Sequence, residues 1–227
     1  MIASSRVRRV RRTLLSWFSI ARRQFYWREA DTSAFAVLLS EILLARTRAE
    51  AVDPVVRSLI ERFPEPVDLM CADVLDVEAI LRPLGLHRTR ARLVVRCATH
   101  LVERCNGTVP STVDELMTLP YVGPYAARAV ASVVFGQRAV VLDANVARVY
   151  QRIFGLPPLR VRITDAKHLW ALADRMVSPA AARDFNWAIL DLGGLVCKAR
   201  NPACADCPLK RQCSMGLRQA RSAELTQ

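Results

Sequence analysis

Four cysteines near the end of the chain constrain its fold more than any other feature. Cys197, Cys204, Cys207 and Cys213 are separated by six, two and five residues, which is close enough for four thiolates to hold one tetrahedral metal centre. The donor set alone leaves the metal open between a zinc ion and a [4Fe–4S] cluster. Ordinary buried cysteines are the alternative, but two further cysteines beside one CxxC pair argue against it.

The residues between these cysteines are basic and turn-forming. They read KARNPA, AD and PLKRQ, and the first stretch contributes Lys198 and Arg200. A metal centre would hold such a segment as a rigid, positively charged surface loop. We therefore expect Lys198 and Arg200 to contact a phosphate backbone.

Basic residues exceed acidic ones along the 227-residue chain, which is long enough for one large domain or two small ones. The net charge of +12 indicates a polyanionic partner. A GC-rich genome explains the use of arginine over lysine but not the excess over acid. The other cysteines, Cys71, Cys97 and Cys105, show no framework spacing, which favours a reducing cytosol.

No run of about 18 apolar residues predicts a membrane-spanning helix. The start of the chain, MIASSRVRRVRR, lacks the apolar core of a secretory signal. We expect a cytoplasmic, nucleoid-associated protein. Residues 1–12 are expected to form a basic arm that is frayed or disordered and is able to touch DNA.

The apolar pattern is helical nearly throughout, without a convincing run of alternating strand residues. Caps and helix breakers delimit the elements: Thr32 or Ser33 caps the second helix, Asp53–Pro54 opens the third, and Asp143 caps a later one. Helices are expected at 13–23, 34–47, 53–63, 68–71, 74–81, 89–105, 113–119, 124–135, 144–154, 165–176 and 184–196.

Residues 112–135 predict two short helices around the turn LPYVGPY. The second helix begins at Pro124, so the turn of Tyr121, Val122 and Gly123 precedes a helix N-terminus. Free N–H groups at such an end favour an anion and grip DNA without reading its sequence. An ordinary connector between two helices is the alternative interpretation.

Together with the cysteine spacing, this hairpin resembles a known family. The segments LPYVGPYAARAVASVVFG and VVLDANVARV, followed by the four cysteines, are similar to the helix–hairpin–helix DNA glycosylases that carry an iron–sulfur cluster. These include endonuclease III, the MutY adenine glycosylases and the archaeal G:T mismatch glycosylases. The resemblance runs from about Trp17 to Cys213 and includes YWRE at 26–29, LLSEILLART at 38–47 and RDFNWAILDLGGLVC at 183–197.

The resemblance implies an all-α fold of two lobes. A six-helix barrel lobe would span residues 30–146 and carry the hairpin, and a cluster lobe would combine residues 13–29 with 147–227. It also implies that the four cysteines hold a [4Fe–4S] cluster rather than zinc. The implied partner is double-stranded DNA with a mismatched or modified base, bound by a monomer.

Two acids acquire roles from the resemblance. Cleavage of a nucleotide's glycosidic bond passes through an oxocarbenium-like sugar, whose charge a carboxylate stabilises. Asp143 stands where the family has its catalytic aspartate, although it also suits the N-cap of the following helix, and both roles are compatible. Glu41 matches a base-pocket glutamate of the MutY and G:T enzymes that endonuclease III lacks. On so apolar a helix face it lies either at a solvent edge or in a pocket that raises its pKa.

The usual lysine nucleophile of the bifunctional members is missing. They place it two residues beyond the second glycine of the hairpin, and this chain has Tyr125 there. Its three lysines all follow residue 166, outside the lobe expected to hold the pocket. We predict a monofunctional glycosylase without a Schiff base. Tyr125 is expected to stack on the flipped base, with packing inside the hairpin as the alternative.

Three features favour thymine or uracil opposite guanine as the target. The segment LGLHRTRAR at 84–92 lacks the tyrosine pair of MutY, and Ala45–Arg46 replaces the MutY glutamine pair, with arginine second as in the G:T enzymes. The residues after Cys213 are too few for the domain that recognises 8-oxoguanine in MutY. Arg46 is expected to fill the gap left by the flipped base or to contact the opposite guanine, with a phosphate contact or solvent as alternatives.

Three other functions stay open from the sequence. They are an adenine glycosylase without its recognition domain, a glycosylase for a modified base, and a non-catalytic DNA-binding protein, against which the two acids argue. Two residues also depart from the family pattern. Tyr121 replaces the hairpin's first glycine, where we expect the backbone not to take a positive φ easily, and Pro124 removes one amide donor.

Overall fold

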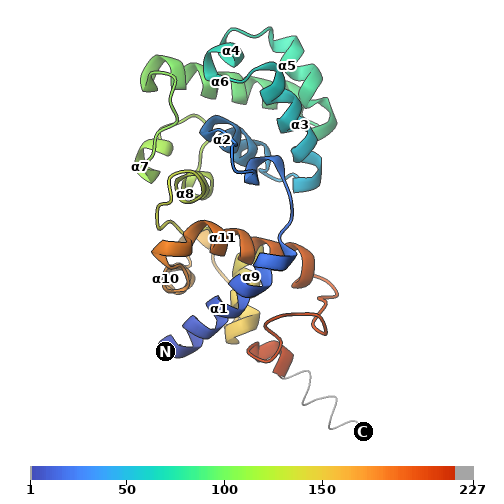
Figure 1. Cartoon of the computed structure of the whole chain (residues 1–227), viewed down its shortest axis with the longest axis vertical. Coiled ribbons are helices and arrows are strands. Elements are labelled where there is room, and N and C mark those ends of the chain that lie inside the picture. Colours follow the sequence, from blue (N-terminus) through green and yellow to red (C-terminus); the bar gives the residue numbers. More distant parts are fainter. Residues whose placement is uncertain (1, 218–227) are drawn as a thin grey trace. The chain divides into compact units, whose positions relative to one another are not determined.

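The computed structural model describes residues 2–217, which form helices and no strands (Figure 1). The α-helices are α1 (Ser4–Ala21), α2 (Ala34–Leu43), α3 (Ala49–Arg62), α4 (Pro66–Met70), α5 (Val74–Leu81), α6 (His87–Cys105), α7 (Val113–Leu116), α8 (Pro124–Val133), α9 (Ala144–Phe154), α10 (Lys167–Met176) and α11 (Ala182–Asp191). A π-helical turn, Leu192–Val196, continues α11. The expected all-α class is therefore confirmed.

The chain divides into two compact units. One comprises residues 24–135, and the other combines the two ends of the chain, through Arg23 and from Gly136 onward. The expected lobe at 30–146 overlaps the first unit, but residues 136–146 group with the chain ends. Met1 and residues 218–227, which were assigned to the arm and to the cluster lobe, lie outside the described residues.

In the unit of residues 24–135, α6 packs along α4 and α5, while α2 packs against α3 and α8. Apolar side chains at helical spacing explain this arrangement, since Leu38, Leu39, Val94 and Leu101 are fully buried. Helices α7 and α8 contact each other and form the hairpin.

In the unit of the chain ends, α1 packs against α10 and α11, and α11 contacts α9. Figure 1 shows α1 in blue beside the orange α11. The buried residues of α1 are Val7, Val10, Leu14 and Phe18, which recur every three or four positions. Because this stripe begins at Val7, residues 4–12 are helical, and the expectation of a frayed or disordered arm is wrong.

The start of α3 also differs from the prediction. Asp53 and Pro54 lie inside the helix, which begins at Ala49. The Asp53 carboxylate is not a cap, because its Oδ1 accepts from the Tyr26 backbone N–H at 2.6 Å. Pro54 lies beyond the first turn and leaves one helical carbonyl without its usual donor.

The cap expected at the start of the second helix forms, since Ser33 accepts from the Ala36 N–H. Thr112 forms a capping box with Glu115, whereas the cap at Asp73, which accepts from the Leu75 N–H, was not predicted. None of the helices within residues 2–217 combines the length and apolar composition that crossing a bilayer requires.

An ion pair ties the two ends of the chain together. Asp191 at the end of α11 is fully buried, and its two oxygens accept from the Nε and the backbone N–H of Arg23 at 2.7 and 3.1 Å. The side chain of Arg23 is 22% exposed. This pair fixes the exit of α1 against α11.

We expect Asp191→Ala to lower the free energy of unfolding by about 3 kcal/mol, because it leaves the Arg23 guanidinium without its carboxylate in a largely buried setting. Urea unfolding followed by circular dichroism measures the change. Asp165→Ala is the control, since its pair with Arg162 is exposed on both sides and should change stability by less than about 1 kcal/mol. Equal effects of the two substitutions would contradict this reading.

Candidate active site and cysteine loop

Asp143 lies at the N-cap of α9, directly after a segment without regular structure. The Asp143 Oδ1 accepts from the Val146 N–H at 2.7 Å, and Oδ2 accepts from the Asn145 side-chain amide at 3.0 Å. The preceding segment is held by the buried Asn186 of α11, which donates to the Ala139 carbonyl and accepts from the Val141 N–H. The capping role is therefore confirmed, and the carboxylate is held in a fixed orientation.

A chain of hydrogen bonds runs from Asp143 to the cysteine segment. Asn145 accepts from Arg148 Nη1 at 2.9 Å, and Arg148 donates through Nε to the Cys197 carbonyl and through Nη2 to the Gly193 carbonyl, both at 3.0 Å. A Cβ atom at Gly193 would lie 3.3 Å from the Cβ of Asn145, so only a glycine fits this approach without displacement. The segment entering the cysteine loop is thus connected to the Asp143 carboxylate.

A second arginine of α9 organises the cysteine loop, which we define as residues 197–213. Arg152 donates to the carbonyls of Lys198 and Ala199 at 2.7 and 3.0 Å, and its Nη1 lies 3.4 Å from the Cys197 sulfur. The Cys213 thiol in turn donates to the Arg152 carbonyl at 3.2 Å. The first and last cysteines of the loop therefore share one residue of α9.

The chemistry of the donor set fits a four-thiolate centre. Burial, together with the smaller effects of Cys197, Cys213 and Cys204, raises the pKa of Cys207 to about 11, and a backbone hydrogen bond at Leu209 partly opposes this. Burial, with Cys197 and Cys213, also raises the pKa of Cys204. Within residues 2–217, however, no three side chains of the metal-binding types are arranged to hold an ion.

Arg148, Arg152 and Asn145 were not among the residues that the sequence singled out. Their signal is the spacing in ANVARVYQR, where residues 145, 148 and 152 recur along one side of a helix that follows Asp143. Lys198 and Arg200 of the loop are exposed, as a contact with DNA requires.

Glu41 lies on the apolar helix α2 in the other unit. The residue is half-buried, and its Oε2 atom is shielded from solvent with no hydrogen-bond partner in the described part of the chain. Burial raises the pKa of Glu41 to about 7, and the charge of the nearby Arg28 partly opposes this. Arg28 is itself buried, with its guanidinium 5.2 Å from the centre of the Phe25 ring. A shielded carboxyl of this kind holds a proton near neutral pH.

The other residues expected at the base pocket belong to the same unit as Glu41. Tyr125 is half-buried in the first turn of α8. Arg46 is exposed in the turn after α2 and adopts the left-handed conformation, with φ 59°. Arg90 braces this turn, since it donates to the Leu43 carbonyl at 2.8 Å and to the Thr47 hydroxyl at 2.6 Å.

The hairpin turn departs from the expectation for Tyr121. Its φ is 66°, so the tyrosine does adopt the left-handed conformation that glycine favours, at a cost of about 1 kcal/mol. Arg96 of α6 holds the ring, because its Nη1 donates to the tyrosine hydroxyl at 2.9 Å and its guanidinium lies 5.6 Å from the ring centre. Val122 is buried and its N–H donates to the Leu119 carbonyl, while Gly123 is exposed before α8.

The all-helical fold, in which α7 and α8 contact each other around the turn at Tyr121, is that of the helix–hairpin–helix class. Residues 39–173 match the family described as HhH-GPD superfamily base excision DNA repair protein. The chain belongs to this superfamily.

Similar proteins include two kinds of glycosylase. The chain is 35% identical over 202 residues to the thymine/uracil-DNA glycosylase of Pyrobaculum aerophilum, covering 88% of this chain and 87% of that protein. It is also 35% identical over 213 residues to the adenine DNA glycosylase of Homo sapiens, covering 89% of this chain but 38% of that protein. The solved structure of a thermostable thymine-DNA glycosylase superposes with a TM-score of 0.86 at 28% identity, covering 94% of this chain and 98% of the other.

The raised pKa of Glu41 gives a pH-dependent stability. The folded protein binds this proton more tightly than the unfolded chain, so the free energy of unfolding falls as the pH rises from the ordinary value of 4.5 to about 7. Glu41→Gln carries no such proton. We expect the variant to gain stability relative to the wild type across this window, by up to about 3 kcal/mol above pH 7.

Urea unfolding at several pH values on both sides of this window measures the difference. Glu103→Gln, which changes an exposed glutamate of α6, is the control for net charge. A difference between wild type and Glu41→Gln that does not change with pH would show that the glutamate is not held protonated by the fold.

Proposed function

We propose that the protein is a monofunctional DNA glycosylase that removes thymine or uracil opposite guanine and leaves an abasic site. The observation that carries the proposal is the shielded Oε2 atom of Glu41, which has no hydrogen-bond partner among residues 2–217 and whose carboxyl has a pKa raised to about 7. A carboxyl with a pKa near the working pH suits proton transfer to or from a reacting group. The family of the chain supplies the substrate class, since its members repair DNA bases.

Asp143 is proposed to stabilise the sugar as the base departs. The developing oxocarbenium charge needs a carboxylate that is already oriented. The Val146 N–H and the Asn145 amide hold Asp143 in place, so little reorganisation is needed during the reaction. Asn145 is in turn held by Arg148.

Glu41 is proposed to act on the flipped base or on the attacking water. Its protonated form donates a hydrogen bond to a pyrimidine carbonyl, and its ionised form orients water. Tyr125 offers a ring for stacking on the base. No lysine occurs before residue 167, so an imine with the sugar has no obvious nucleophile in residues 24–135.

We propose that both units contact DNA, mainly through N–H groups and cationic side chains that bind its phosphates. The exposed turn around Tyr121 and Gly123 precedes the N-terminus of α8, where N–H groups favour phosphate. Arg46, Lys198 and Arg200 are exposed cations that suit phosphates or guanine edges. The strained backbone at Arg46 and Tyr121 supports a role for both turns in binding.

Thymine or uracil is favoured over adenine by Ala45–Arg46 and by the segment at 84–92, which lacks the tyrosine pair of MutY. Because the identity to both is 35%, adenine opposite guanine or 8-oxoguanine is the second candidate.

Cys197, Cys204, Cys207 and Cys213 are proposed to hold a [4Fe–4S] cluster. When bound, the cluster would hold the loop in one conformation, and it would be able to accept or donate an electron. Arg148 and Arg152 fix the backbone at the start of the loop, since they donate to the carbonyls of Cys197, Lys198 and Ala199. This arrangement displays Lys198 and Arg200 toward solvent.

We expect base release at T or U opposite G in single-turnover assays, with strand breaks that require hot alkali and with no borohydride-trapped adduct. Asp143→Asn should slow release by at least about 100-fold. Asparagine caps helices as well as aspartate does, so the loss would reflect the missing charge and not the helix end.

The same panel includes A:G, A:8-oxoguanine and common modified bases. Release of adenine would assign the protein to the second candidate. Mismatch binding without release of any base, equal in wild type and in Asp143→Asn, would contradict the enzymatic proposal and indicate a DNA-binding protein.

We expect the purified protein to contain about four iron and four sulfide per chain. Cys213→Ser should lower both, because it removes one of the four ligands, while Cys71→Ser is the control, since that cysteine is exposed in the other unit. Elemental analysis with sulfide determination measures the content. One zinc per chain would show that the metal is zinc and not iron. A protein that contains neither iron nor zinc would contradict the proposed metal centre.

A further inference from the structure

Helix α1 carries a cationic face opposite its buried stripe. Arg8, Arg9 and Arg12 are exposed, whereas Val7, Val10, Leu14 and Phe18 are packed in the core. The same exposed side continues with the small residues Ser5, Ser16 and Ser19, which would not obstruct a large ligand. No acidic residue occurs in the sequence before Glu29.

These arginines differ from Arg6 on the same helix. Arg6 donates to the carbonyls of Ile153 and Gln212 and to the Ser214 hydroxyl, so it is part of the fold. Arg8, Arg9 and Arg12 make no ion pair or hydrogen bond to any residue between 2 and 217. Their charges are therefore available to a ligand.

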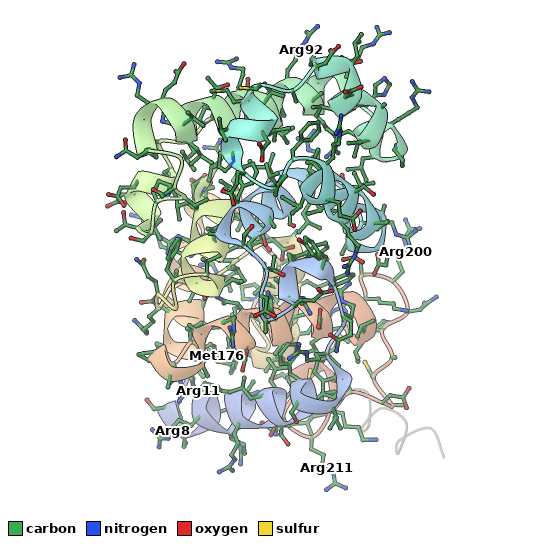
Figure 2. The ribbon with its side chains drawn as sticks, turned by 45° about the horizontal axis from the view of Figure 1, so that its top comes forward. Arg8, Arg11, Arg92, Met176, Arg200 and Arg211 are labelled. Carbon is green, nitrogen blue, oxygen red and sulfur yellow. The ribbon has the colours of Figure 1, made fainter. Side chains whose placement is uncertain are left out.

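Arg211 adds a fourth charge from the far end of the chain. It is exposed and, within the same described range, likewise lacks an acceptor. Its neighbour Gln212 donates to the Thr13 hydroxyl of α1 at 2.8 Å, which sets this segment beside the helix. Figure 2 shows Arg8 and Arg211 both directed outward near α1. We call Arg8, Arg9, Arg12 and Arg211 the arginine face.

The charge and shape of the arginine face favour duplex DNA over an anionic lipid surface. Arg8, Arg9 and Arg12 lie on one exposed side of α1, so their charges repel one another. A phosphate backbone, with one charge per about 1.7 Å of duplex, relieves that repulsion. A lipid surface is less suitable, because a membrane-binding amphipathic helix needs a free apolar face, and that of α1 is buried.

We propose that the arginine face is a second, sequence-independent binding surface for duplex DNA. Its three α1 arginines lie outside both the hairpin turn, which belongs to residues 24–135, and the cysteine loop with Lys198 and Arg200, and Arg211 is the member that the face shares with that loop. The face retains the protein on undamaged DNA between target sites. The inference rests on the proposed function in taking DNA as the ligand.

The test uses the full chain with Arg8, Arg9 and Arg12 all changed to Gln. Glutamine matches arginine in helix propensity, so α1 should persist, and circular dichroism checks this. Fluorescence anisotropy with an undamaged duplex, over a series of salt concentrations, gives the affinity and its salt dependence. We expect weaker binding and a slope of log K against log salt that is smaller by about 2 to 3.

Two matched variants accompany the test. Replacing Arg8, Arg9 and Arg12 by Lys keeps the charges and should restore the wild-type slope. Replacing the exposed Arg160, Arg162 and Arg183 of the same unit by Gln removes three charges elsewhere and should leave the slope close to that of wild type. An equal fall in slope in this control would overturn the proposal, because net charge alone would explain it.

An unchanged slope in the Gln variant would overturn the proposal, even if the wild type releases thymine from a G:T duplex. A reduced slope would support it, even if the wild type releases no base, in which case the proposed function fails alone. Loss of binding to anionic vesicles with DNA binding intact would assign the face to lipid and overturn the proposal.

Discussion

Two arginines of α9 join the elements on which the proposed chemistry depends. Arg148 and Arg152 donate to backbone carbonyls at the entry of the cysteine loop, and Arg148 also holds the Asn145 side chain that contacts Asp143. Guanidinium groups suit this task because each offers several donors in a fixed plane. The position of the Asp143 carboxylate and the conformation of the loop are therefore not independent. A disturbance of the loop backbone at Cys197 would reach Asp143 through only two side chains.

The burial of Glu41 lowers the stability of the fold and shifts the pKa of its carboxyl into the range of proton transfer. A leucine at this position would continue the apolar face of α2, whereas the glutamate leaves an oxygen shielded from water without a partner in the described residues. The nearby charge of Arg28 offsets part of the cost of ionisation but not all of it, because burial is the larger effect on the pKa. The outcome is a carboxyl that is ready to gain or lose a proton near neutral pH. Such a group is destabilising in isolation and suits the proton transfer that we propose for it.

Much of this structure could be predicted from local signals in the sequence. Helix α5 has the predicted bounds of Val74–Leu81, and the capping box of Thr112 and Glu115 forms as Ser/Thr-x-x-Glu patterns predict.

The predictions that failed did so because of tertiary contacts. Asp53 resembles a cap but is used by the distant Tyr26 N–H, and residues 4–12 are helical because α10 and α11 cover the stripe that begins at Val7. Tyr121 accepts a left-handed backbone because Arg96 holds its ring, a contact across 25 residues that no local pattern reveals. The roles of Asp143 and Glu41 came from resemblance, since an N-cap and an apolar helix face were the simpler local interpretations.

The pairing of Arg23 with Asp191 has a consequence for how the protein is made. These residues are 168 positions apart, so α1 leaves the ribosome long before its partner helix exists. At about 5 to 20 residues per second, that interval is on the order of 10 to 30 seconds. Residues 24–135 form a compact unit without the chain ends, and all of them leave the ribosome during this interval. Val7, Val10, Leu14 and Phe18 must meanwhile remain uncovered, flanked by arginines. The flanking arginines give that uncovered stripe a strongly charged surround, and such charges oppose the association of apolar segments.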